Sequence, residues 1–340
     1  MKAAEEALVA AEATTPAVRA VPAPAKRMLK FKKGKLDNPV RILVYGLEKI
    51  GKTSFAAQIP NAIFLCKENG TEQYDVARMP EPTCWKPNSK HPDTQGMDVF
   101  SMIEDLRVSD HDFQALVIDT VDWIEPLVHR WVCQTSPGKP VTTIVEAYKG
   151  YGRGYTVAMD EWRSLLAQLD RLRNERRMHI VLLGHAHVKN FNNPEGENYD
   201  RFELKMHDKS AAILKEWCDG VLFAHQEVGA IEKETAPDES KNKMYGFSKG
   251  ARHLWTQRRA AWDAGNRYDL PEKLPLSWES FYQFAKLQKA PPPEEMIATI
   301  HEKMALISEE NQKKVYGFLD RAGTDADKLK QIMQWVESIQ

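Results

Sequence analysis

A glycine-rich octapeptide between an apolar run and a helical pattern constrains this chain more than any other feature. Gly46 to Thr53 matches G-x-x-x-x-G-K-[ST] at every position and directly follows the apolar run Ile42–Tyr45. Glycines let the backbone approach a bound phosphate with several N–H groups, and the N-terminus of the next helix adds partial positive charge. The segment therefore predicts a nucleotide-phosphate site between a strand and a helix. A plain glycine turn before a helix is the alternative interpretation.

Each position of the octapeptide has an expected role. Lys52 is expected to reach the β- and γ-phosphates of ATP, and the hydroxyl of Thr53 is expected to be a ligand of Mg²⁺. The backbone around them is expected to enclose the phosphates. The predicted ATP-binding residues are Gly46, Leu47, Glu48, Lys49, Ile50, Gly51, Lys52, Thr53 and Ser54.

An acid at the end of a later apolar run completes the predicted magnesium site. The run Ala115–Ile118 is followed by Asp119. A carboxylate at the end of a neighbouring parallel strand can hold Mg²⁺ through its water shell. Because Asp119 follows the glycine-rich segment in the expected order, we predict this role for it, rather than that of a chance acid at a strand end.

From Val40 to about Leu276, short apolar runs alternate with longer amphipathic ones, which predicts an α/β fold with a mostly parallel central sheet. The predicted strands are rich in Val, Ile and Leu and apolar on both faces, as buried parallel strands are. They are Arg41–Tyr45, Ala62–Cys66, Ala115–Asp119, His179–Gly184 and Gly220–Ala224. The predicted helices are Lys52–Gln58, Val99–Leu106, Trp123–Val132, Thr156–Arg173 and Ser210–Trp217.

The two ends of the chain differ from this core in composition. Residues 1–35 are rich in Ala and Pro and end in a run of lysines, which predicts a disordered tail with a basic stretch. The core domain is predicted at residues 36–288, followed by a proline-rich linker at 289–293. Three amphipathic segments predict a small helical module at 294–340, with Ser308 and either Thr324 or Asp325 as N-caps.

Composition excludes several classes of protein. No apolar run approaches the roughly 18 residues that span a bilayer, and the net charge of −1 excludes a polycation. Nucleic-acid binding would therefore depend on local basic patches. Four scattered cysteines are expected to be free thiols in a reducing cytoplasm, that of an infected bacterial host if a phage encodes the chain. They are Cys66, Cys84, Cys133 and Cys218.

Several of these segments together resemble RecA and related ATPases. The octapeptide with Glu48 resembles the RecA phosphate loop, and Val117–Val121 resembles the Walker B segment of that family. A closer resemblance is to phage RecA-like nucleotide-binding proteins, a family that includes short single-strand annealing recombinases. It covers about residues 30–275 and rests also on Tyr151–Tyr155, Trp162–Leu172 and Ala261–Pro271. The resemblance implies a RecA-like ATPase core that assembles into a ring or filament.

The resemblance also implies roles for residues outside the phosphate loop. Glu68 is expected to activate the attacking water, with Glu72 as a competing acid. His185 is expected to sense the γ-phosphate. A cation that completes a neighbouring subunit's site is expected at Lys249 or Arg252, with Arg258 and Arg259 as rivals. His185, His187 and His207 lack the spacing of a zinc finger, so a zinc site is disfavoured.

Two segments combine cations with aromatic rings, a pattern typical of single-stranded DNA grooves. The first comprises Tyr148, Lys149, Tyr151, Arg153 and Tyr155, and the second runs from Lys189 to Arg201. Ordinary surface loops are the alternative, and the acids Glu195 and Glu197 weaken the case for the second segment.

These observations favour a DNA-stimulated ATPase of phage type that binds single-stranded DNA and promotes annealing or strand pairing. An ATP-switched loader or scaffold for replication proteins is the second hypothesis. A small-molecule kinase is disfavoured, because no arginine-rich lid segment is evident. The C-terminal helices are expected either to recruit a partner, such as a single-strand binding protein, or to cap the fold.

Overall fold

The computed structural model describes residues 38–87, 96–233, 243–286, 293–304 and 307–338. Within residues 228–249 only the backbone of the described residues is specified. The predicted tail at 1–35 and nearly all of the predicted linker at 289–293 lie outside these ranges.

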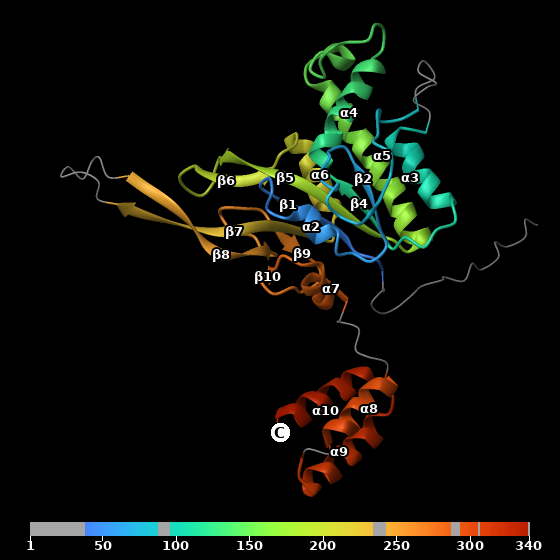
Figure 1. Ribbon diagram of the computed structural model, residues 1–340, viewed down its shortest axis with the longest axis vertical. Helices are drawn as coiled ribbons and strands as arrows, with labels where there is room; N and C mark the ends of the chain where they lie inside the picture. Colours follow the sequence, from blue (N-terminus) through green and yellow to red (C-terminus); the bar gives the residue numbers. More distant parts are fainter. Residues whose placement is uncertain (1–37, 88–95, 234–242, 287–292, 305–306, 339–340) are drawn as a thin grey trace, which may run out of the picture. The chain divides into compact units, whose positions relative to one another are not determined.

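A mixed sheet forms the centre of the core (Figure 1). Its main path has the order β10-β8-β7-β1-β5-β4-β2-β3, with β6 paired to β5 and β9 paired to β7. Pairing is parallel from β7 through β1, β5, β4 and β2 to β3, and antiparallel at β8 and β10. The strands are β1 (Arg41–Gly46), β2 (Ala62–Cys66), β3 (Ala77–Arg78), β4 (Ala115–Asp119), β5 (His179–Phe191), β6 (Tyr199–Leu204), β7 (Gly220–Lys233), β8 (Lys243–Trp255), β9 (Gly265–Asn266) and β10 (Lys273–Pro275).

Helices cover both faces of this sheet, which explains why its central strands are apolar throughout. In β1, Leu43 and Tyr45 join a cluster with the helices of one face, while Ile42 and Val44 join a second cluster on the other. The first face carries α3 (Val99–Val108), α4 (Val121–Gln134), α5 (Arg153–Arg176) and α6 (Asp208–Trp217), and the second carries α2 (Lys52–Ala56) and α7 (Trp278–Lys286). The predicted α/β fold with a mostly parallel sheet is confirmed.

The five predicted strands and the five predicted core helices are all present, but two strands continue beyond their predicted ends. β5 runs on to Phe191 and β7 to Lys233, and each continuation pairs antiparallel, with β6 and β8. These continuations carry polar and charged residues, so the apolar signal of a buried strand stops before the strand does.

Three helices follow the core, namely α8 (Pro293–Met304), α9 (Glu309–Ala322) and α10 (Ala326–Ser338). They share an apolar cluster of their own, which includes Ile300, Val315 and Leu329. Ser308 is the N-cap residue of α9, and the Asp325 carboxylate accepts a hydrogen bond from Lys328 N at the start of α10. The predicted helical module is therefore present as three helices.

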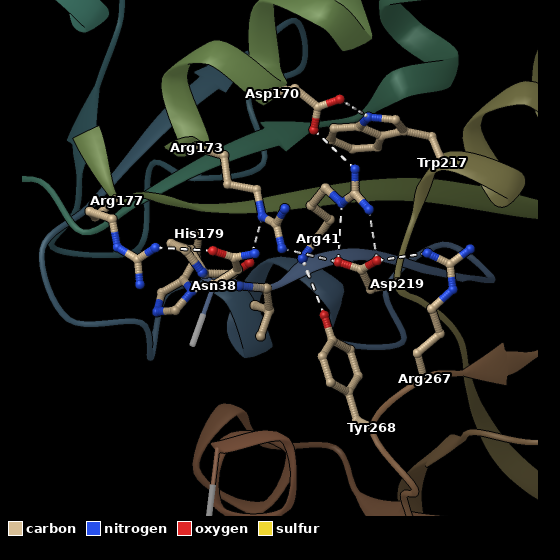
Figure 2. Close-up of polar contacts among 12 residues, drawn as sticks. Asn38, Arg41, Asp170, Arg173, Arg177, His179, Trp217, Asp219, Arg267 and Tyr268 are labelled. Carbon is tan, nitrogen blue, oxygen red and sulfur yellow. Dashed lines mark hydrogen bonds and ion pairs between the residues drawn. The ribbon is translucent and has the colours of Figure 1, made fainter. Parts of the chain in front are cut away.

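A cluster of arginines and aspartates ties together the beginnings of the central strands, at the edge opposite the glycine-rich segment (Figure 2). Asp219, just before β7, accepts two hydrogen bonds from Arg41 at 2.8 and 3.1 Å. Arg173 and Arg267 also donate to this carboxylate, at 3.3 and 2.9 Å. Arg41 donates further to Asp170 at 3.0 Å. One carboxylate thus pairs with three guanidinium groups, which come from β1, α5 and the loop after β9.

Replacing Asp219 with asparagine is expected to lower the free energy of unfolding by about 3–5 kcal/mol, because Arg173 would lose its counter-charge while mostly buried and Arg41 would keep only Asp170. Burial alone would raise the pKa of Asp219, but the hydrogen bonds and charge of Arg41 lower it below its ordinary value. The carboxylate therefore stabilises the fold above pH about 3.9, and this contribution is lost as the pH falls through the lower folded pKa.

Urea unfolding at pH 7 and at pH 3 measures this effect. Asp160→Asn is the control, since Asp160 is exposed and pairs with exposed Arg163 on the same helix. Equal stability of Asp219→Asn and wild type at pH 7 would contradict the role given to the cluster.

Candidate nucleotide site

The glycine-rich segment joins β1 to α2 as a tight loop, and two of its glycines are required by geometry. A Cβ on Gly46 would lie 2.3 Å from the carbonyl oxygen of Ala224 on the neighbouring β7. Gly51 has φ 111°, a left-handed conformation that side chains rarely adopt. The loop therefore passes close to the sheet and delivers Lys52 to the first position of α2.

Lys52 is the buried cation of this loop, with a side chain turned back over it. Lys52 is 5% exposed, and its Nζ atom donates hydrogen bonds to the backbone carbonyls of Gly46 at 3.1 Å and Leu47 at 2.9 Å. Burial lowers the pKa of Lys52, and the negative charges of Asp119 and Asp122 partly oppose this effect. The ammonium group is thus placed among acids and within the phosphate loop.

Asp119 meets the phosphate loop at the end of β4. The Thr53 hydroxyl donates to its Oδ2 at 2.8 Å, so the two predicted magnesium-site residues are in contact. Burial raises the pKa of Asp119, the Thr53 hydrogen bond opposes this shift, and the charge of Glu68 adds to it. A hydroxyl beside a carboxylate is the donor set expected for Mg²⁺ in a P-loop site, so these residues fit the ion.

A short segment after β2 forms the opposite wall. Arg78 holds it in shape by donating to Thr71 Oγ1 at 2.9 Å, to the Val76 carbonyl at 2.8 Å and to the Tyr74 carbonyl at 2.6 Å. The Tyr74 hydroxyl in turn lies 2.6 Å from Ser54 Oγ on α2. The segment is thereby fixed against the helix that follows the phosphate loop.

His185 continues the site on β5, where it is in register with Gly46 of β1. Asp122, in the first turn of α4, accepts from the backbone N–H of His185 at 2.9 Å, and its other oxygen lies 2.8 Å from Nδ1 of the ring. The Nε2 atom of His185 lies 4.0 Å from Oε2 of Glu68. The imidazole is therefore held between an aspartate behind it and a glutamate in front of it.

These groups surround one cavity of about 350 Å³. Five residues predicted to be catalytic line it together, namely Lys52, Glu68, Asp119, His185 and Arg252. Glu72, the competing acid, is exposed and is not among the lining residues. The full lining is Lys49, Gly51, Lys52, Thr53, Ser54, Glu68, Gly70, Tyr74, Asp119, His185 and Arg252.

The position of Arg252 differs from the expectation of a cation that reaches a neighbour's site. It lines the cavity of its own chain, and its Nη1 atom lies 3.2 Å from where a Cβ on Gly51 would be. Lys249 lies in the part of β8 for which only backbone is described. The rivals Arg258 and Arg259 pair with Asp263 and Glu272 and are not among the lining residues.

The first predicted DNA segment forms an unusual turn before α5. Tyr148 to Gly152 are five consecutive residues with positive φ, between 54° and 78°. Such conformations strain the non-glycine residues among them. Tyr151 is 97% exposed, and Lys149 and Arg153 are also exposed. The turn therefore presents one free ring between two cations.

The other two tyrosines of this segment are engaged by the protein. The Tyr155 ring stacks on His207 with centroids 4.0 Å apart and planes 8° from parallel. Tyr148 is half-buried, packs against the core and donates through its hydroxyl to the Thr135 carbonyl at 3.3 Å. This corrects the expectation of three stacking faces, because only Tyr151 of these three tyrosines is exposed.

The second predicted DNA segment comprises the paired ends of β5 and β6 and the loop at 192–198 between them, with Lys189 in register with Arg201. Arg201 is 3% exposed, lies over the Phe191 ring and places Nε 2.8 Å from Glu203 Oε1. Lys189 forms an ion pair with Asp208. This corrects the expectation for Arg201, whose paired and buried guanidinium is not presented to a phosphate.

Sequence reasoning missed Gly70 and Tyr74 in the cavity wall and Asp122 behind His185. Asp122 had a detectable signal, since it is an acid in the first helical turn after the strand that ends in Asp119. Tyr74 had none, because its position depends on the fold of the segment that Arg78 holds.

None of the described helices is both long enough and apolar enough to cross a membrane. Across the described ranges, no group of three or more His, Cys, Asp or Glu side chains is arranged to hold a metal ion.

No curated protein matches the chain. Among solved structures, that of the RadB recombinase is similar with a TM-score of 0.36 and 12% identity, over 72% of this chain and 90% of that one. The model of a family described as AAA domain matches residues 38–268, which span the phosphate loop, Asp119 and His185. The chain therefore belongs to this AAA domain family, and its mostly parallel α/β core carries the phosphate loop.

Proposed function

We propose that this protein hydrolyses ATP to ADP and phosphate. The observation that carries the proposal is the single cavity in which Lys52 and Thr53 of the phosphate loop meet Glu68, Asp119 and His185. Nucleotide binding alone needs no carboxylate besides Asp119 at the phosphate site, whereas hydrolysis needs a group that accepts a proton from water. Glu68 supplies it, 4.0 Å from His185.

Each side chain has one task in this reaction. Lys52 binds the β- and γ-phosphates. Glu68 takes a proton from the attacking water while the water oxygen forms a bond to the γ-phosphorus. The bond from that phosphorus to the bridging oxygen breaks, and ADP leaves with the electron pair. Thr53 and Asp119 would hold Mg²⁺, which supplies positive charge beside the phosphates. Arg252 adds positive charge at the wall near Gly51.

We further propose that the protein acts in DNA recombination as a phage-type RecA-like ATPase, binding single-stranded DNA and promoting annealing or strand pairing. The turn before α5 supports DNA binding, because Tyr151 offers a free ring between Lys149 and Arg153. The phage type rests on the sequence resemblance, as does assembly into a ring or filament.

An ATP-switched loader or scaffold for replication proteins is the second candidate. The apolar cluster shared by α8–α10 favours it, since a helical module with its own core can recruit a partner such as a single-strand binding protein. On this hypothesis residues 36–288 are the switch domain and 294–340 the recruiting domain.

The ATP hydrolysis rate with and without single-stranded DNA separates the two candidates. Strong stimulation by DNA would support the recombination protein. Slow turnover that DNA does not change would support the loader or scaffold.

Substitutions in the turn before α5 test DNA binding directly. Tyr151→Ala is expected to weaken binding of a labelled single-stranded oligonucleotide by about 1–3 kcal/mol, because a stacked base loses its ring, with little change in salt dependence. Arg153→Ala is expected to reduce the slope of log affinity against log salt by about 0.7, the contribution of one phosphate.

Fluorescence anisotropy across a salt series, with ATP present, measures both effects. The matched controls are Tyr316→Ala, another exposed tyrosine, and Arg163→Ala, which lies on α5 and pairs with Asp160. If the affinity and slope of the Tyr151 and Arg153 variants equal those of the controls, the turn is not a DNA site.

A further inference from the structure

Asp122 is a buried carboxylate beside the nucleotide cavity, and both of its oxygens contact one neighbouring residue, His185. Its side chain is 6% exposed, and both of its oxygens face His185. Oδ1 accepts from the backbone N–H at 2.9 Å and Oδ2 lies 2.8 Å from Nδ1. Because Asp122 also lies in the first turn of α4, the positive end of that helix favours its charge.

The protonation state of Asp122 decides which ring nitrogen of His185 carries the hydrogen, Nδ1 facing Asp122 or Nε2 facing the cavity. Burial alone would raise the pKa of Asp122, but the hydrogen bonds from His185 outweigh it and lower that pKa. An ionised carboxylate only accepts hydrogen bonds, so Nδ1 must carry a proton and donate it. In the neutral ring Nε2 is then an acceptor, directed toward Glu68.

A single water in the cavity can contact both Nε2 of His185 and Oε2 of Glu68. The two atoms are 4.0 Å apart, so a water oxygen beside the pair can lie about 2.8 Å from each, within hydrogen-bond distance of both. Such a water would donate one hydrogen to Glu68 and the other to Nε2. Both of its hydrogens would then be fixed, and a lone pair would be left for attack on phosphorus.

We propose that Asp122 is a positioning residue for ATP hydrolysis, holding His185 in the Nδ1–H form so that Nε2 and Glu68 together orient the attacking water. His185 is then more than a sensor of the γ-phosphate, since it contacts the reacting water. The effect of Asp122 on the rate of hydrolysis rests on the proposed ATPase function. The tautomer of His185 does not depend on that function.

The kinetic test is a double-mutant cycle on single-turnover hydrolysis at saturating ATP. Asp122→Asn is expected to slow the reaction about 10- to 100-fold with unchanged ATP affinity, because the amide N–H₂ faces Nδ1 and favours the other tautomer. In a His185→Ala background the same substitution is expected to change the rate less than about 2-fold. Asp98→Asn is the control, since Asp98 is a buried aspartate that caps α3 away from the cavity, and it should keep the wild-type rate.

Two kinetic results would overturn the proposal. One is wild-type turnover in Asp122→Asn. The other is an equal loss with and without His185, which would show that Asp122 acts on the structure of α4 and not through the imidazole.

The form of the ring is measured without activity, by ¹H–¹⁵N correlation NMR of histidine-labelled protein, with His185 assigned by His185→Gln. The Nδ1–H tautomer is expected in wild type and the Nε2–H tautomer in Asp122→Asn. An Nε2–H tautomer in wild type would overturn the proposal. The expected tautomers in a protein that does not hydrolyse ATP would contradict the proposed function while leaving the pairing intact.

Discussion

Replacing Lys52 with alanine is expected to abolish measurable ATP turnover, with a loss of about 10²- to 10³-fold or more at saturating ATP. Lys52 is the buried ammonium group of the phosphate loop, and its neighbours include the acids Asp119 and Glu68. Without it, a triphosphate would face these carboxylates without the cation that offsets them. ATP affinity should therefore also fall, by about 2–5 kcal/mol, the usual cost of losing one partner of a buried charge pair.

The measurement is phosphate release together with equilibrium binding of a fluorescent ATP analogue. Lys205→Ala is the matched control, because Lys205 is 58% exposed and pairs loosely with Glu48 of the phosphate loop at 4.0 Å. Removing that cation should change neither quantity appreciably. Wild-type turnover in a folded Lys52→Ala protein would show that the phosphates bind elsewhere.

The parallel core could be predicted because its signal is local. β1, β2 and β4 are short apolar runs followed by polar or glycine residues, and each is buried on both faces. A strand that is buried on both faces has the same apolar sequence pattern whatever its position in the sheet. The antiparallel continuation of β5 to Phe191 lacks this signal, because alternate residues face solvent and its partner β6 defines it.

The same distinction applies to the nucleotide site. Gly51, Lys52 and Asp119 could be predicted because motif spacing fixes them at strand ends, where parallel strands bring their carboxyl ends together. Tyr74 could not, because its role arises from a contact between segments distant in sequence. Asp122 was marked only by its place in the first helical turn after Asp119, and its contact with His185 arises from the fold.

The DNA segments show the limit of composition as a guide. Arg201 and Tyr151 were both predicted to bind nucleic acid, yet one is 3% exposed and the other 97%. The difference comes from pairing, since Arg201 faces Glu203 and Phe191 within a hairpin. A count of cations and rings in a segment does not distinguish a paired guanidinium from a free one.

Replacing Glu68 with glutamine is expected to separate ATP binding from hydrolysis. The amide keeps the shape of the side chain but cannot take a proton, so the rate should fall by about 10²- to 10⁴-fold, the span of general-base effects. ATP affinity should be equal or tighter, because the substitution removes a negative charge from a cavity that must hold a triphosphate. This combination distinguishes a base from a binding residue, for which affinity and rate would fall together.

Glu72→Gln provides the matched control for this prediction. Glu72 follows Glu68 on the same segment, but it is exposed and is not among the residues that line the cavity. Chemical-quench measurement of single-turnover hydrolysis on both variants should therefore show a loss only for Glu68→Gln. A loss confined to Glu72→Gln would make Glu72 the base, and would require the segment held by Arg78 to rearrange when ATP binds. Full activity in both variants would mean that neither acid accepts the proton, and the 4.0 Å approach of Glu68 to His185 would then have no part in the chemistry.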